Sequence, residues 1–145
     1  FFCENSAVNA ILSYFSEQAR TFGITYTVSA SIPKHISVSE TDLSILFGNL
    51  LENAIDACNA QSGGDKKIIV RAKTDDHSLC VTIDNTFSGS LDIDQKGHFV
   101  SSKHEGLGLG TESIKSIAEK YGGVCQFEAN NGMFYASVMC FKDHA

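Results

Sequence analysis

The spacing of hydrophobic residues changes along this chain, and the order of these changes limits the fold. Spacings of three and four residues predict helices over residues 3–22, from Ser39 to about Ala60, and from Gly108 to Tyr121. Alternating spacing predicts strands over residues 24–32, 67–74, 78–85, 124–129 and 133–141. This mixed order predicts an α/β (α+β) two-layer sandwich, with three main helices on one face of a mixed, about five-stranded sheet.

Residues 86–107 separate the two halves of this pattern and have no periodic spacing. They are rich in Gly, Ser, Lys and His, which predicts a loop. We expect this loop to be a lid that is mobile until a ligand binds. Between the last two strands, Asn130-Asn131-Gly132 predicts a hairpin turn.

The composition excludes several classes of protein. The 145 residues suffice for one domain, and 43% of them are hydrophobic, so a core can form. Acidic residues outnumber basic ones by 17 to 11, which argues against binding to nucleic acids or anionic membranes. No apolar run approaches the roughly 18 residues of a membrane span. The first residue is Phe rather than Met, so we expect a fragment of a longer protein.

The cysteines do not predict a metal site or a disulfide framework. Their number is odd, the gaps between them are long, and no CxxC pair exists. Most lie in apolar stretches, so we expect buried, reduced thiols, as in the cytoplasm. The five are Cys3, Cys58, Cys80, Cys125 and Cys140.

Four polar residues share one stripe of the second predicted helix. At about 100° per residue, Glu52, Asn53 and Asp56 all lie within about 60° of Asn49. No Lys or Arg interrupts the stripe, although solvated helix faces usually mix charges. Two interpretations stay open: a surface that contacts water, or a set of oxygen ligands for a hard divalent cation.

Glycines alternate with leucines at the start of the third predicted helix, from Gly106 to Gly110. Glycine lets the backbone approach a ligand closely, and a helix N-terminus favours anions, so this segment is a candidate phosphate cradle. Lys103 could add a charge, and hydroxyls could come from Ser101, Ser102 and Thr111. The alternative is a flexible surface loop. The segment fits neither the dinucleotide-binding nor the P-loop pattern, because no strand precedes it and no Gly-Lys-Ser/Thr is present.

Three segments together resemble the motifs of the GHKL family of ATPases and kinases. Residues 49–57 resemble its asparagine box, residues 85–89 its first glycine box, and residues 106–110 its second. The resemblance extends over nearly the whole chain and is greatest to the catalytic, ATP-binding domain of bacterial sensor histidine kinases. Within that group the chain resembles the AgrC-like branch, on residues 3–5, 8–12, 19–24 and 99–103.

This resemblance implies one histidine kinase-like ATPase domain over residues 1–145, with the Bergerat fold and with 1–22 as a leading helix. It implies ATP and Mg²⁺ as cofactors, Asn53 as the metal ligand, and catalytic roles for Asn49, Glu52 and Lys103. The nucleotide-binding residues that it implies are Asn49, Asn53, Asp56, Asn85, Gly89, Ser102, Lys103, Gly106, Gly108, Leu109, Gly110 and Thr111.

One position in the asparagine box bears on the reaction. In the gyrase-like ATPases the residue that corresponds to Asn49 is a glutamate that activates water. An amide cannot act as a general base. The resemblance therefore favours phosphoryl transfer to a partner side chain over hydrolysis of ATP.

The first glycine box departs from the family pattern. The family has Asp-x-Gly-x-Gly, in which the carboxylate accepts a hydrogen bond from the adenine amino group. Here the strand alternation places Asn85, not Asp84, on the inner face with Val81 and Ile83. Phe87 stands where the family has its first glycine, and only Gly89 matches. We expect Asn85 to accept from adenine without the charge of a carboxylate.

The expected function is transfer of the γ-phosphate of Mg-ATP to a histidine outside this chain. No histidine of the chain has the sequence context of a phospho-acceptor, so we expect the acceptor in a dimerisation domain upstream of Phe1. That domain and a response regulator are the expected partners, without nucleic acid and without membrane contact by this domain. The expected location is the cytoplasmic part of a membrane-anchored sensor kinase. Two alternatives stay open: a serine kinase of the anti-sigma type, and a degenerate, non-catalytic interaction module.

Overall fold

A computed structural model describes residues 1–88, 92–93, 99–100 and 105–141 of the chain. In these residues one mixed sheet has the strand order β1-β2-β3-β7-β6. Strands β1 and β2 pair in parallel, and the other neighbours pair antiparallel. The strands are Thr25–Ser31 (β1), Lys67–Thr74 (β2), Ser78–Thr86 (β3), Val124–Asn130 (β6) and Met133–Phe141 (β7).

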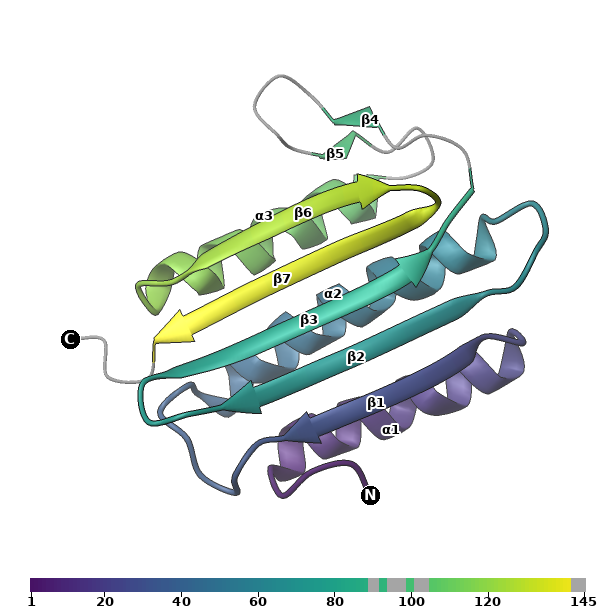
Figure 1. The fold of residues 1–145 in the computed structure, drawn as a ribbon. Coiled ribbons are helices and arrows are strands. Elements are labelled where there is room, and N and C mark those ends of the chain that lie inside the picture. Colours follow the sequence, from purple (N-terminus) through teal and green to yellow (C-terminus); the bar gives the residue numbers. More distant parts are fainter. Residues whose placement is uncertain (89–91, 94–98, 101–104, 142–145) are drawn as a thin grey trace.

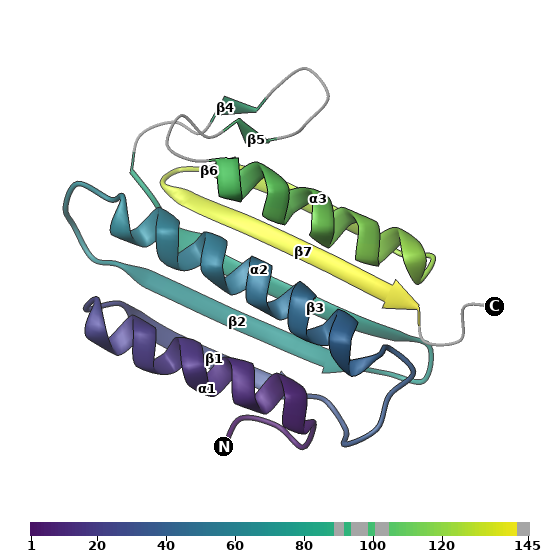
Figure 2. The same ribbon diagram turned by 180° about the vertical axis from the view of Figure 1, so that it is seen from behind.

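Three helices cover one face of this sheet, and no described helix covers the other (Figures 1 and 2). They are α1 (Ser6–Thr21), α2 (Glu40–Asn59) and α3 (Glu105–Lys120). The predicted fold class, three helices on a five-stranded mixed sheet, is confirmed. Within the described ranges, no helix combines the length and apolar character that a membrane crossing requires.

Two predicted boundaries were wrong for physical reasons. Helix α1 begins at Ser6 rather than at residue 3, because Asn5 is its N-cap and accepts a hydrogen bond from Val8 N. Helix α3 begins at Glu105 rather than at Gly108. Each glycine weakens a helix by about 1 kcal/mol relative to alanine, so the sequence signal is weak in the first turns of α3.

The segment predicted as a loop also contains two short strands, β4 (Asp92–Ile93) and β5 (Phe99–Val100), which pair antiparallel. Strands of two residues are too short to give a periodic pattern. The rest of the predicted lid, residues 89–91, 94–98 and 101–104, lies outside the described residues.

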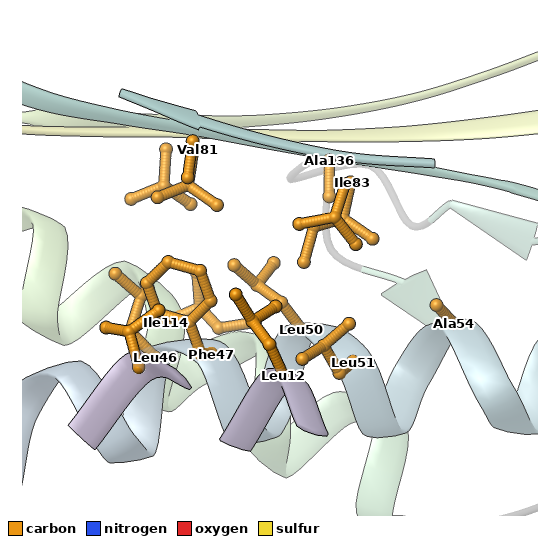
Figure 3. Packing of buried hydrophobic residues seen from close by; sticks show 14 of the residues in the cluster. Leu12, Leu46, Phe47, Leu50, Leu51, Ala54, Val81, Ile83, Ile114 and Ala136 are labelled. Carbon is orange, nitrogen blue, oxygen red and sulfur yellow. The ribbon is translucent and has the colours of Figure 1, made fainter. Parts of the chain in front are cut away.

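The core lies between the sheet and the helices and is centred on α2. Figure 3 shows Leu46, Phe47, Leu50 and Leu51 of α2 facing the sheet, where Val81, Ile83 and Ala136 point toward them. Leu12 of α1 and Ile114 of α3 complete the cluster from either side. This burial fixes the rotation of α2, so that its polar stripe faces away from the sheet.

The cysteines contribute to this core in part. All five are free; Cys3, Cys58 and Cys140 are buried, whereas Cys80 and Cys125 are half-buried. Burial raises the pKa of the Cys140 thiol to about 11, which keeps it protonated at neutral pH.

Two turns in the second half of the chain depend on special backbone positions. Asn131 and Gly132 have φ values of 51° and 78°, as the predicted hairpin between β6 and β7 requires. Gly123 follows α3, and its N–H donates to Ala118 O at 2.8 Å. A Cβ atom at Gly123 would overlap the backbone carbonyl of Met139, so only glycine fits where the chain crosses β7.

Candidate functional site

The outer face of α2 presents the predicted polar stripe. Asn49, Asn53 and Asp56 are half-buried, whereas Glu52 is exposed. Among the described residues, the side chains of Asn49 and Asn53 have no hydrogen-bond partner. In the described part of the chain, neither amide belongs to the buried side-chain polar atoms that lack a partner, so both amides reach solvent and stay accessible to a ligand. They are therefore candidates for ligand contact.

The N-terminal half of α3 passes close to the side chains of these two residues. A Cβ atom at Gly110 would lie 3.4 Å from Asn53 Oδ1 and 3.8 Å from Asn49 Cβ. Side chains larger than alanine at this position would cover the amide of Asn53. The structure thus brings together Asn49, Asn53 and Gly110, which the sequence analysis singled out separately. Thr111, the next residue of α3, is buried.

Asn85 lies on the inner face of β3, as the strand alternation predicted. It is 2% exposed and pairs across the sheet with Ile68 of β2 and Phe134 of β7, both buried and apolar. Its Nδ2 donates to Thr86 O at 2.9 Å, and its carbonyl oxygen takes no part in that bond. An amide in such surroundings needs partners, which makes Asn85 a second candidate for ligand contact.

Asp84 faces the opposite way. It lies on the side of the sheet without helices, and its Oδ2 is 3.2 Å from Arg71 Nη1 of β2. The prediction that Asn85, and not Asp84, lies on the inner face of β3 is therefore confirmed. Asp84 cannot reach the helix layer without reversing the strand.

A cysteine that the sequence analysis did not single out joins α2 to the end of β3. The Sγ of Cys58, in the last turn of α2, lies 3.6 Å from Thr86 O and 3.7 Å from Lys67 O. The next residue after β3, Phe87, donates from its backbone N–H to Gly132 O at 3.0 Å. These contacts hold the segment after Asn85 between α2 and the β6–β7 hairpin. Nothing in the sequence was a reason to select Cys58, because a cysteine in an apolar stretch is expected to be an ordinary core residue.

The opposite end of the helix layer carries an ion-pair network. Asp42 Oδ2, in the first turn of α2, accepts from Lys120 Nζ at 2.8 Å and from Tyr121 Oη at 2.6 Å. The hydrogen bonds from Lys120 and Tyr121 hold the pKa of the Asp42 carboxyl below its usual value. Tyr121 Oη also accepts from Ser39 N, the N-cap of α2. The network fixes α3 against α2 and so sets where Gly110 meets Asn53.

The donor set fits a magnesium ion that is shared with phosphate groups. Among the described residues, no cluster of three or more His, Cys, Asp or Glu could hold a metal. Mg²⁺ does not need one, because it is usually held by one or two protein oxygens together with substrate phosphates and water. The carbonyl oxygen of Asn53 is a hard ligand of that kind, and it lies near the second turn of α3, a helix whose N-terminal end favours phosphate.

Several predicted site residues are not brought to the site by the described structure. Gly89, Ser102 and Lys103 lie outside the described residues. Gly106, Gly108 and Leu109 belong to the first turns of α3, as predicted for Gly108 and Leu109, whereas Gly106 was predicted as loop. Backbone N–H groups in the first turn of a helix have no partner within the helix, so they can still donate hydrogen bonds to an anion.

Comparison with known proteins identifies the family of this chain. The family model described as "GHKL domain" matches residues 38–140. The curated relative "Probable C4-dicarboxylate sensor kinase" of Bacillus subtilis (strain 168) is 26% identical over 139 residues, which cover 89% of this chain and 25% of that protein. The chain therefore spans a quarter of the length of this relative.

Solved structures of histidine kinases share the fold. The catalytic domain of histidine kinase ThkA superposes with a TM-score of 0.73 at 21% identity, covering 95% of this chain and 93% of that one. Acinetobacter baumannii histidine kinase AdeS gives a TM-score of 0.69 at 12% identity, over 98% of this chain and 66% of that one. The family match includes α2, α3 and the motifs that meet at Asn53, and by this match the chain belongs to the GHKL domain family.

Proposed function

We propose that this domain binds Mg-ATP and transfers the γ-phosphoryl group to a histidine outside the chain, as the catalytic domain of a sensor histidine kinase of the AgrC-like branch. The observation that carries the proposal is the position of Gly110 of α3, where an added Cβ atom would lie 3.4 Å from Asn53 Oδ1 and 3.8 Å from Asn49 Cβ. The fold of histidine kinase catalytic domains and the sensor-kinase relative support it.

In this proposal α3 binds the phosphate oxygens and α2 binds the metal ion. Free N–H groups at the start of α3 bind phosphate oxygens, and the helix dipole favours their negative charge. Asn53 holds the magnesium ion through its carbonyl oxygen, with Asn49 beside it. The ion supplies charge neutralisation at the phosphates. Lys103 and Ser102 are proposed to contact the terminal phosphates, and Gly89 to contact the nucleotide.

Adenine is proposed to lie against the inner end of β3. Asn85 pairs across the sheet with Ile68 and Phe134, and its carbonyl oxygen is proposed to accept from the adenine amino group. Because the acceptor is an amide, the hydrogen bond has no charge assistance. Asp84 has no part in the site, since it pairs with Arg71 on the other face.

The proposed reaction is an in-line displacement. A nitrogen of the acceptor histidine attacks the γ-phosphorus, a P–N bond forms, and the P–O bond to ADP breaks with its electron pair going to ADP. The asparagine stripe offers no general base at Asn49, which disfavours attack by water. The carboxylates of Glu52 and Asp56 are proposed to orient the amides or the bound water around the metal.

The phosphoryl group is then proposed to pass to a response regulator. The structure of histidine kinase ThkA in complex with the response regulator protein TrrA gives a TM-score of 0.70 at 20% identity. It covers 97% of this chain and 41% of that one. The proposal also makes this chain a single domain, and the cytoplasmic part of a membrane-anchored sensor.

Calorimetric titration of ATP in Mg²⁺ and in EDTA tests the nucleotide site. We expect binding in Mg²⁺ and clearly weaker binding in EDTA. No binding in either buffer would overturn the proposal and leave the interaction module, which the Phe87 replacement in the first glycine box favours.

Incubation of the full-length protein with γ-labelled ATP tests the chemistry. Acid-labile label on a histidine outside residues 1–145 is the expected result. Acid-stable label on a partner serine would identify an anti-sigma type of kinase instead. Label on a histidine within residues 1–145 would contradict the assignment of the acceptor to another segment.

A further inference from the structure

The residues before α1 are held against the domain by a side chain of the helix. Phe2 N donates to Asn9 Oδ1 at 2.6 Å, and Cys3 N donates to the same oxygen at 3.4 Å. Figure 2 shows the segment running beside the start of α1 before it turns into the helix. Terminal segments usually fray unless something ties them down. Here a single carbonyl oxygen fixes two consecutive amides.

Asn5 fixes the other end of the same segment. Its Oδ1 accepts from Val8 N at 3.2 Å, as the N-cap of α1, and its Nδ2 lies 3.4 Å from both Pro33 O and Lys34 O. Its backbone N–H donates to Ile32 O at 3.1 Å. Serine and aspartate could cap the helix, but they could not also donate as an amide does. We call Asn5 and Asn9 together the N-terminal clamp.

Apolar contacts support the clamp. Cys3 is 4% exposed, and the ring of Phe2 meets Tyr26 of β1 edge-on, with 6.3 Å between centroids. Tyr26 Oη donates in turn to Leu12 O of α1 at 3.1 Å. Phe2 is half-buried, whereas Phe1 is 88% exposed. The clamp therefore sets the direction in which any preceding segment departs.

The clamp and the candidate nucleotide site lie at opposite ends of the helix layer. Helices α1 and α2 run in the same direction, and the clamp is at the start of α1, whereas Asn53 and Cys58 lie in the second half of α2 (Figure 2). Loss of the clamp is thus not expected to disturb nucleotide contacts.

We propose that Asn9, by holding Phe2 and Cys3, is a positioning residue for phosphoryl transfer: it fixes the angle between this domain and the segment that carries the acceptor histidine. This inference rests on the proposed function. Transfer between two separately folded parts depends on the geometry in which they meet, and a small misplacement costs a large factor in rate. Asn9 acts through the chain that it holds and touches neither nucleotide nor acceptor.

The full-length protein tests this with three variants. Asn9→Ala removes the acceptor of both amides, whereas Asn9→Asp keeps an acceptor oxygen near the start of a helix, where a carboxylate is tolerated. Ser13→Ala is the matched control, because it removes a hydrogen bond to the backbone carbonyl of Asn9 but leaves the clamp in place. The measurements are the initial rate of phosphohistidine formation at saturating ATP and the affinity for Mg-ATP.

We expect Asn9→Ala to lower the rate by about tenfold or more while the ATP affinity stays that of the wild type. Asn9→Asp and Ser13→Ala should keep the wild-type rate. An unchanged rate in Asn9→Ala, a parallel loss of ATP affinity, or failure of Asn9→Asp to restore the rate would each overturn the inference. A wild-type protein that binds no ATP would instead overturn the proposed function.

Amide hydrogen exchange gives a readout that does not depend on activity. The amides of Phe2 and Cys3 should exchange slowly in the wild type and in Asn9→Asp, and rapidly in Asn9→Ala. Rapid exchange in the wild type would show that the clamp does not hold the segment in solution, and would also overturn the inference.

Discussion

The two ends of the helix layer differ in whether their polar side chains have hydrogen-bond partners. At one end, which we call the closed end, the Asp42 carboxylate accepts hydrogen bonds from Lys120 and Tyr121, and the Tyr121 hydroxyl also accepts from Ser39 N. At the other end, among the described residues, the amides of Asn49 and Asn53 have no partner, and Gly110 leaves space beside them. The closed end fixes how α2 and α3 pack. The end with Asn49 and Asn53, which we call the open end, presents polar atoms that can form hydrogen bonds with a ligand.

The largest effect on the closed end is expected from Gly123→Ala. The added Cβ would overlap the carbonyl of Met139, where Gly123 leads α3 into the sheet. We expect the free energy of unfolding to fall by about 3 kcal/mol, the upper end of the cost of overpacking. Urea unfolding followed by circular dichroism measures it.

Gly48→Ala is the matched control for that change. A Cβ at Gly48, inside α2, would meet no atom within 4 Å. The same substitution should therefore stabilise the protein by about 0.5–1 kcal/mol through helix propensity. A similar loss of stability in both variants would mean that the close crossing at Gly123 is not the cause.

At the open end, Asn53→Ala is expected to give the largest loss of nucleotide affinity. It removes the oxygen proposed to hold the metal, and a contact to a charged group is worth about 1.5–3 kcal/mol, or roughly 10–100-fold in affinity. Calorimetry should show weaker Mg-ATP binding and little further loss in EDTA. Asn59→Ala, an exposed asparagine in the last turn of the same helix, is the control and should bind as the wild type does. Equal affinity of Asn53→Ala and wild type would contradict the metal role.

A smaller loss is expected from Asn85→Ala. A neutral hydrogen bond contributes about 0.5–1.5 kcal/mol, and the unpaired adenine amino group adds to the cost, so ATP affinity should fall by about tenfold. Asn85→Asp should bind at least as well as the wild type, since a charged acceptor makes a stronger bond.

Asp84→Ala provides the contrast within the same strand. Asp84 pairs with the exposed Arg71 on the other face, and pairs with a solvent-exposed partner contribute little. ATP affinity should stay unchanged. If Asp84→Ala abolished binding and Asn85→Ala did not, the adenine contact would have been assigned to the wrong face of β3.

The residues of the open end could be predicted from the sequence, whereas those of the closed end could not. The open end was predictable because its residues lie on local periodic elements: a helical repeat places Asn49 and Asn53 on one stripe, and strand alternation places Asn85 inward. The closed end was not, because Asp42 and Lys120 are 78 positions apart and meet only when α2 and α3 pack. The spacing of residues in the sequence did not single out Asp42 or Lys120. Asn9 was likewise missed as a clamp, because its partners depend on how the segment before α1 folds back.

The smallest effect concerns acid unfolding at the closed end. Asp42 has its pKa lowered in the folded state, by the hydrogen bonds from Lys120 and then Tyr121, from an ordinary value of 3.8. Such a group contributes its full stability above the unfolded-state pKa and loses it as the pH falls through the folded-state pKa. The free energy of unfolding of the wild type should therefore exceed that of Asp42→Asn at pH 7, and the gap should close as the pH falls below 3.8. Glu17→Gln, which removes an exposed pair with Arg20, is the control and should show no such gap, because both partners are in water. Urea unfolding of the three proteins between pH 7 and pH 2 measures this. A gap that stays constant down to the lowest pH would mean that Asp42 stabilises the helix start as a hydrogen-bond acceptor, independent of its charge.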